Sequence, residues 1–321
     1  MDSEVKRELT KFVRKSGRRN PRFENYGFTL KLLLRNKIAL AGLIIAIFYS
    51  IITILDYVDP HYLGVTNIAT AINFLHGAPL NSTGSAVTPP TLSRGWYYYL
   101  GTTKYGIPIL PAMFAALKID ITYTLVIAGG GAIIGTLVGS LSGFIGGVFD
   151  QVVMRMTDVF FSIPNLVLAI AIAFILGFTF RNIAIAFLIV SWPAYARIVR
   201  STVLSLREAK FVEAAFAAGV SKVRILFSHL IPNSFSPVLV QFSLQFGSVI
   251  QLFAALAFLG FVAGNAFAPE LGNMISWGET YLAAGKWWAI TIPGIFLIIF
   301  SVGLNLLGDG LRDVLDPKLR S

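Results

Sequence analysis

Residues 230–269 read LIPNSFSPVLVQFSLQFGSVIQLFAALAFLGFVAGNAFAP and contain no charged side chain. A helix needs about 20 consecutive, mostly apolar residues to cross about 30 Å of hydrocarbon. This stretch is therefore long enough for one membrane span and a further re-entrant or loop segment, which we place after Gly260. It indicates that the chain is a membrane protein.

The composition of the whole chain agrees with this interpretation. Hydrophobic residues make up 55% of the 321 residues and charged residues only 13%, whereas a soluble domain carries about 25% charged residues. Mean hydropathy is +0.73. A water-soluble fold of this size could not bury so much apolar surface, so we predict an all-α, polytopic membrane protein.

Uncharged runs elsewhere in the chain predict the remaining spans. The six runs expected to cross the membrane lie at 38–55, 121–149, 159–180, 182–196, within 230–260, and at 287–308. The organisation expected from them is a basic arm with an interfacial helix (1–37), a first transmembrane helix (38–58), an external loop (59–118), a core of five further helices (119–310) that includes a cytoplasmic segment (205–233), and a tail (311–321).

The distribution of lysine and arginine predicts the orientation. With the arm 1–37 inside, twenty-one of the 26 basic residues lie on the inner side and five on the outer side, as the positive-inside rule requires. Both termini are then cytoplasmic, and the net charge of +10 is directed at anionic membrane lipid rather than at nucleic acid.

Signatures of catalysis and of metal binding are absent from the sequence. The chain has no cysteine and only three histidines, and it contains no G-x-x-x-x-G-K-[ST], H-E-x-x-H or G-x-S-x-G motif. We therefore expect a non-catalytic chain that holds no metal or other cofactor and does not hydrolyse ATP by itself.

The segment 206–233 carries the most informative residues. Glu213, Ala214 and Ala215, followed by Ala218 and Gly219, predict a short cytoplasmic helix with a thin face of small side chains, which permits close approach to another protein. Gly219 can end that helix by adopting a left-handed conformation. An ordinary alanine-rich helix packed on its own chain is the alternative interpretation.

The pattern Glu213-Ala214-Ala215, then Gly219, then Ile231-Pro232 resembles the EAA signature of binding-protein-dependent ABC importer permeases. The sequence SHLIPN at 228–233 is similar to the corresponding sequence in the dipeptide and oligopeptide branch of these permeases. The stretches SWPAYAR at 191–197 and NLLGDGLRD at 305–313 resemble the C-type subunit of that branch. The sequence at 101–108, GTTKYGIP, departs from the family pattern because it lacks the usual acidic and arginine residues.

This resemblance implies a six-helix permease of the type I importer kind in a prokaryotic cell membrane. It implies four kinds of partner, namely a homologous second permease, two ATPase subunits that hold ATP and Mg, an extracytoplasmic substrate-binding protein, and membrane lipid. The EAA helix is then the coupling helix that docks on an ATPase. Import of di- or oligopeptides is the expected function, with oligosaccharides or nickel as alternative cargoes and an ion-coupled secondary transporter as the alternative from another class.

Several residues within the spans are candidates for structural or gating roles. Glycines recur every four residues from 131 to 147, which favours close packing against another helix. Pro164 and Pro193 are expected to bend the spans that contain them. Asp158 is expected to be the only acid well inside a span and to pair with Arg155, one turn away.

A polar stripe on the fifth span predicts the translocation pathway. Gln241, Gln245 and Ser248 fall on one face at 100° per residue, with Gln251 at its edge. These groups either bond neighbouring helices or line a water-filled passage, and Leu239 and Leu244 are expected to stay protected.

One surface modification is suggested by the external loop. Asn81 opens an Asn-Ser-Thr sequon, which makes it a candidate for N-glycosylation.

Overall fold

The computed structural model describes residues 34, 36–58, 87–91, 98–262 and 268–315. Within these ranges the chain forms helices and one isolated β-bridge between Thr102 and Pro108. The helices are α3 (Lys37–Val58), α5 (Ile109–Ile145), α6 (Gly147–Ser162), α7 (Asn165–Leu176), α8 (Phe180–Arg207), α9 (Lys210–Ala217), α10 (Lys222–Ile225), a π-helical turn (Leu226–Leu230), α11 (Ile231–Asn233), α12 (Phe235–Phe258), α13 (Leu271–Leu282) and α14 (Trp288–Leu315).

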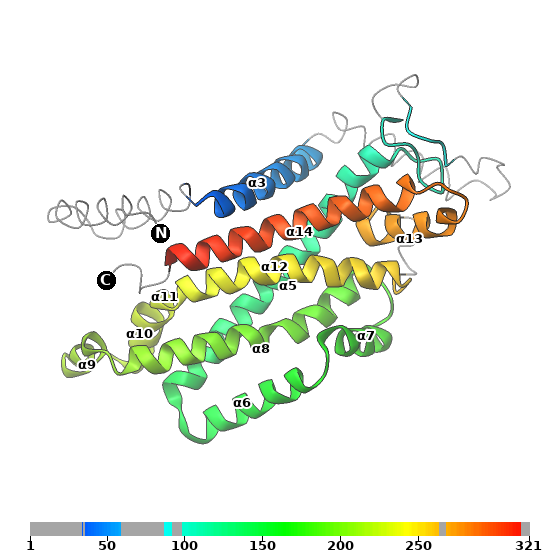
Figure 1. Ribbon diagram of the computed structural model, residues 1–321. Coiled ribbons are helices and arrows are strands. Elements are labelled where there is room, and N and C mark those ends of the chain that lie inside the picture. Colours follow the sequence, from blue (N-terminus) through cyan, green and yellow to red (C-terminus); the bar gives the residue numbers. More distant parts are fainter. Residues whose placement is uncertain (1–33, 35, 59–86, 92–97, 263–267, 316–321) are drawn as a thin grey trace.

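The long helices form an elongated bundle with two distinct ends (Figure 1). Helix α5 packs most extensively on α8, while α14 lies between α3 and α12. The short helices α9, α10 and α11 lie at one end of the bundle, and α13 lies at the other. We call these the α9 end and the α13 end. Because the start of α3 packs on the last turns of α14, the described chain begins and finishes at the α9 end.

In the described part of the chain, five helices are long and apolar enough to cross a membrane, namely α3, α5, α8, α12 and α14. The predicted third span, 159–180, is wrong as a single helix. Helices α6 and α7 meet at Pro164 with a bend of 94°, and proline there begins α7 instead of lying inside a helix. The expected count of six holds if this bent pair is one span.

Both boundaries of the second span differ from those predicted, whereas the fourth span extends inward past Arg197 and Arg200, as the sequence allows. Helix α5 begins at Ile109, so the end of the predicted external loop 59–118 is helical. It ends at Ile145, because Gly146 and Gly147 both adopt positive φ. Helix α8 runs on through Pro193 as far as Arg207. The arm up to residue 33, residues 59–86 with Asn81, and the end of the tail lie outside the described residues.

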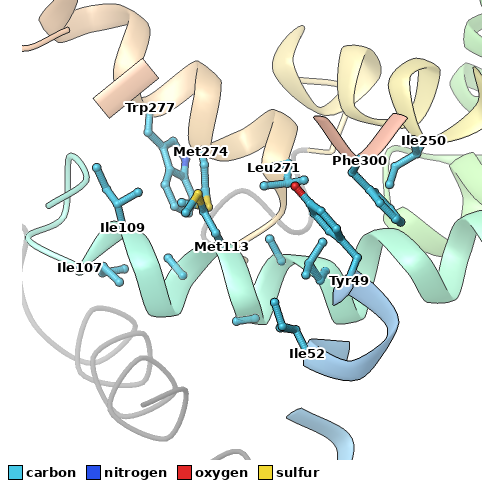
Figure 2. Packing of buried hydrophobic residues seen from close by; sticks show 14 of the residues in the cluster. Tyr49, Ile52, Ile107, Ile109, Met113, Ile250, Leu271, Met274, Trp277 and Phe300 are labelled. Atoms are coloured by element: carbon cyan, nitrogen blue, oxygen red, sulfur yellow. The ribbon is translucent and has the colours of Figure 1, made fainter. Parts of the chain in front are cut away.

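The largest buried cluster joins α3, α5, α13 and α14 (Figure 2). Tyr49 of α3 stacks on Phe300 of α14 with ring centroids 4.4 Å apart, and its hydroxyl donates to the carbonyl of Phe296 at 2.8 Å. On the other side of the cluster, Met274 and Trp277 of α13 pack over the first turns of α5. This cluster fixes α13 to the spans.

The predicted glycine face of α5 is the surface that packs on α8. A Cβ added at Gly135 would lie 2.5 Å from the carbonyl oxygen of Trp192, and one at Gly143 would lie 2.9 Å from that of Arg200. Gly131 and Gly139 meet Ser191 and Ala196 at similarly short range. The glycines therefore let the two backbones touch, whereas the fifth glycine of the repeat, Gly147, begins α6 and takes no part.

Candidate functional site

The segment predicted to couple the chain to a partner contains the short helices α9, α10 and α11, and α9 projects from the α9 end of the bundle (Figure 1). Helix α9 follows α8 after a two-residue break and is only eight residues long. A helix this short is not stable alone in water, so its order depends on contacts with the bundle. Val212 supplies the main one, because it is fully buried against Val199, Val203 and Leu230.

The end of α9 is built as the sequence predicts. Gly219 has φ of +75°, its N–H donates to the carbonyl of Phe216 at 3.0 Å, and the N–H of Val220 donates to that of Ala215 at 3.1 Å. These two bonds form a Schellman motif, for which glycine is the favoured residue. The motif stops the helix and turns the chain back toward α10.

The predicted docking residues lie on the outer side of this helix. Glu213, Ala214, Ala218 and Gly219 are exposed, and Ala215 is half-buried. The alternative, an alanine-rich helix packed on its own chain, therefore does not describe this face. Two aromatic side chains that the sequence analysis did not single out, Phe211 and Phe216, are 43% and 42% exposed beside it. On a helix plot Phe211 lies about 100° from the buried Val212, whereas Phe216, four residues after Val212, falls on the side of Val212, so spacing alone could have found only Phe211.

Two ion pairs connect the bent pair α6–α7 to α8, close to the coupling segment. Asp150 of α6 accepts two hydrogen bonds from the guanidinium of Arg200 and one from the hydroxyl of Ser142. Asp158 accepts from Arg197 at 2.7 Å. Its predicted partner Arg155 is farther away at 3.9 Å, and the guanidinium of Arg197 also lies over the ring of Phe161. Arg197 is therefore the principal partner of Asp158.

The expectation that Asp158 is the only acid inside a span is wrong. Asp120 lies within α5 and Asp56 within α3, and both are buried. Asp158 itself is 53% exposed. The sequence analysis missed Asp120 because it began the second span at residue 121, one position too late to include it.

The polar stripe of α12 divides into two parts. The amide of Gln245 contacts the carbonyl of Ser191 on α8 at 3.5 Å and that of Gln241 contacts Gln245 at 3.4 Å, whereas Ser248 and Gln251 are exposed. Leu239 is also exposed in this chain, at 36%, and its protection from water-soluble reagents stays a prediction. The stripe thus includes one contact between helices and a polar surface that this chain leaves uncovered.

Comparison with known proteins identifies the family. Residues 135–321 match the model of the family described as "Binding-protein-dependent transport system inner membrane component". The chain belongs to this family. Membership confirms the resemblance carried by the EAA-like motif and shows a multi-pass membrane component of a transport system, in place of an ion-coupled secondary transporter.

Relatives extend the family match over most of the chain. The chain is 35% identical to the dipeptide transport system permease protein DppC of Alkalihalophilus pseudofirmus, over 91% of this chain and 89% of that protein. It is 38% identical to the probable D,D-dipeptide transport system permease protein DdpC of Escherichia coli, over 72% and 75% of the two chains. It is 36% identical to the glutathione transport system permease protein GsiD of Pectobacterium atrosepticum, over 70% and 74%.

Proposed function

We propose that this chain is the transmembrane permease subunit of an ATP-driven importer for di- or oligopeptides. The single observation that carries the cargo class is the set of relatives, whose names denote dipeptide, D,D-dipeptide and glutathione permeases. Oligosaccharide or nickel import has no comparable support among them. The family description supports an external binding protein as one partner, and the other partners in this proposal are a homologous permease and two ATPase subunits.

The docking face of α9 supports the coupling role. Small exposed side chains allow a partner to approach the helix backbone, and exposed aromatic side chains commonly anchor protein interfaces. Helix α9 joins both α8 and, through α10 and α11, α12. A partner that moves α9 therefore acts directly on two spans, one of which carries the polar stripe.

The charge distribution supports an orientation with the α9 end in the cytoplasm. Arg207, Lys210, Lys222 and Arg224 lie in or beside the coupling segment. With Lys37 at the start of α3 and Arg312 in the last turn of α14, the described part of the α9 end carries at least six cations, whereas that of the α13 end carries four, namely Lys104, Lys118, Arg181 and Lys286. The positive-inside rule then places the ATPase partners at the α9 end and the binding protein at the α13 end.

The coupling role is tested by Ala214→Leu in the complete transporter reconstituted in vesicles. Ala214 is exposed, so the larger side chain meets only the partner, and we expect dipeptide uptake and substrate-stimulated ATP hydrolysis to fall at least about tenfold, which corresponds to about 1.4 kcal/mol. Gly219→Leu should have the same effect, but it also strains a positive φ.

The control places the same side chain elsewhere at the α9 end. Ser205 is exposed on α8, and Ser205→Leu should leave uptake unchanged. Normal coupling in Ala214→Leu would remove the docking role from α9. Uptake of maltooligosaccharide or Ni²⁺ in place of dipeptides by the unmodified transporter would overturn the cargo class alone.

A further inference from the structure

Two acidic side chains that the transport mechanism above does not use meet where α13 begins. Asp120 projects from α5 and Glu270 immediately precedes α13, and both residues are 0% exposed. The N–H of Leu271, the residue after Glu270, donates to the carboxyl group of Asp120, which places the two acids beside each other. They are 150 residues apart in sequence, so this contact ties two distant elements together.

Backbone donors satisfy only one oxygen of each carboxyl group. The N–H of Leu271 donates to Oδ2 of Asp120 at 3.3 Å, and the N–H of Asn273 donates to Oε2 of Glu270 at 2.8 Å. Oδ1 of Asp120 and Oε1 of Glu270 have no N–H or hydroxyl donor, and the buried hydroxyl of Thr124, one turn along α5, bonds neither of them. Two carboxylates can only accept hydrogen bonds, so one of these two acids can supply a donor to the other only if it carries a proton.

Among the residues that the structure describes, no cation compensates this pair. Neither carboxyl group takes part in any of the salt bridges of this described part. Lys118 is 3.7 Å from Asp56 and serves that carboxylate instead. Helix α12 carries no charged residue, and Arg181 of α8 and Glu279 of α13 are exposed.

The remaining titratable groups of the surrounding elements are also engaged or distant. Tyr105 packs on the ring of Trp277, Tyr123 stacks on Phe253, and Lys286 lies over the ring of Tyr281. The charged residues of α14, Asp309, Arg312 and Asp313, lie at the α9 end. Two adjacent buried carboxylates without a counter-charge would repel each other strongly, which is the condition under which such pairs retain a proton.

We propose that Asp120 and Glu270 bind one shared proton, and that this proton holds the first turn of α13 against α5. The same two residues organise that turn, because Glu270 caps α13 and Asp120 accepts from its first residue. Loss of the proton leaves two anions in contact, and α13 then separates from the spans. The chain thus carries a pH-dependent latch at the end opposite the coupling segment.

The pH window of the latch follows from burial. Burial away from water raises the pKa of Glu270 from 4.5 to about 7. A carboxyl group whose pKa is higher in the folded state stabilises that state fully below its unfolded pKa, and this stabilisation is lost as pH rises through the folded pKa. The thermal stability of the purified chain should therefore fall between about pH 4.5 and 7.

The test compares the unmodified full-length chain with Asp120→Asn and Glu270→Gln, measured in detergent across this range. Each amide has nearly the shape of the acid and supplies a permanent N–H donor, so both variants should lose the fall in melting temperature while they keep α13 in place. Infrared difference spectra should show the C=O band of a protonated carboxyl group in the unmodified chain and in neither of these two amide variants. Asp158→Asn, which alters an exposed acid elsewhere, should retain both the fall and the band.

Two results would overturn the proposal. One is a melting temperature with the same pH dependence in the unmodified chain and in both amide variants, together with absence of the infrared band. The other is full restoration of stability at neutral pH by Ca²⁺ and its removal by a chelator, which would assign the pair to a metal ion. If one amide variant fails to fold, the other and the infrared band decide the matter.

Discussion

At the scale of single residues, the contact between α5 and α8 depends on the absence of side chains. A Cβ at Gly139 would lie 2.8 Å from the Cα of Ala196. Although alanine favours helix over glycine by about 1 kcal/mol, we expect Gly139→Ala to destabilise the chain by about 1–3 kcal/mol through overpacking. Thermal unfolding in detergent measures the change.

Gly129→Ala is the matched control, since nothing lies within 4 Å of a Cβ at that position on the same helix. It should leave the melting temperature unchanged or raise it. Equal destabilisation by both substitutions would show that the glycines serve the helix backbone and not the packing.

At the scale of helices, the two ion pairs between α6 and α8 differ in burial and should differ in importance. The side chains of Asp150 and Arg200 are 13% and 29% exposed, whereas those of Asp158 and Arg197 are 53% and 49% exposed. We expect Asp150→Asn to destabilise the chain by about 1.5–3 kcal/mol, the range for charged hydrogen bonds. Asp158→Asn should cost less than about 1 kcal/mol, as exposed pairs do.

Chemical denaturation of the two variants checks this ranking, with Asp150→Asn combined with Arg200→Gln as a further control. Removing both charges should recover part of the loss, because the partly buried guanidinium is then no longer left without a partner. A larger effect at Asp158 than at Asp150 would contradict the assignment of Asp150 as the main link between α6 and α8.

The sequence predicts the helices well where hydropathy alone determines them, as in α3 and α14. It fails at the bent pair, because α6 and α7 are both apolar and only the position of Pro164 distinguishes a break from a kink. At the candidate site it predicts from local spacing the short helix α9 and its stop at Gly219. It misses Asp120, Glu270 and the Asp150–Arg200 pair, since these contacts join residues 50 to 150 positions apart.

At the scale of the whole molecule, cysteine labelling along the polar stripe of α12 tests whether its exposed surface is in contact with water. Ser248 and Gln251 are exposed, and in the assembled transporter we expect cysteines at 241, 248 and 251 to react with water-soluble thiol reagents. Cysteines at Ile250 and Phe253, which are buried, should stay protected and serve as further controls beside Leu239 and Leu244. The chain has no native cysteine, so labelling has no background.

Protection at every position would show that lipid or a partner helix covers the stripe. That outcome would return Gln241, Ser248 and Gln251 to the packing interpretation, in which amides and hydroxyls bond neighbouring helices for about 0.6 kcal/mol each. Reaction at 248 and 251 alone would confine the passage to the half of α12 nearer the α13 end.

The Schellman stop at Gly219 has a mechanical consequence for the proposed importer. A flexible tether would absorb a displacement of the ATPase, but α9 is anchored through Val212 and closed by two backbone hydrogen bonds. It therefore behaves as a rigid helix about 12 Å long, at 1.5 Å per residue, that is connected to both α8 and α12. In that importer, a movement of the ATPase subunits that displaces α9 is transmitted as rotation of α8 and α12. The stiffness of the turn at Gly219 then limits how much of that movement reaches the membrane-spanning helices.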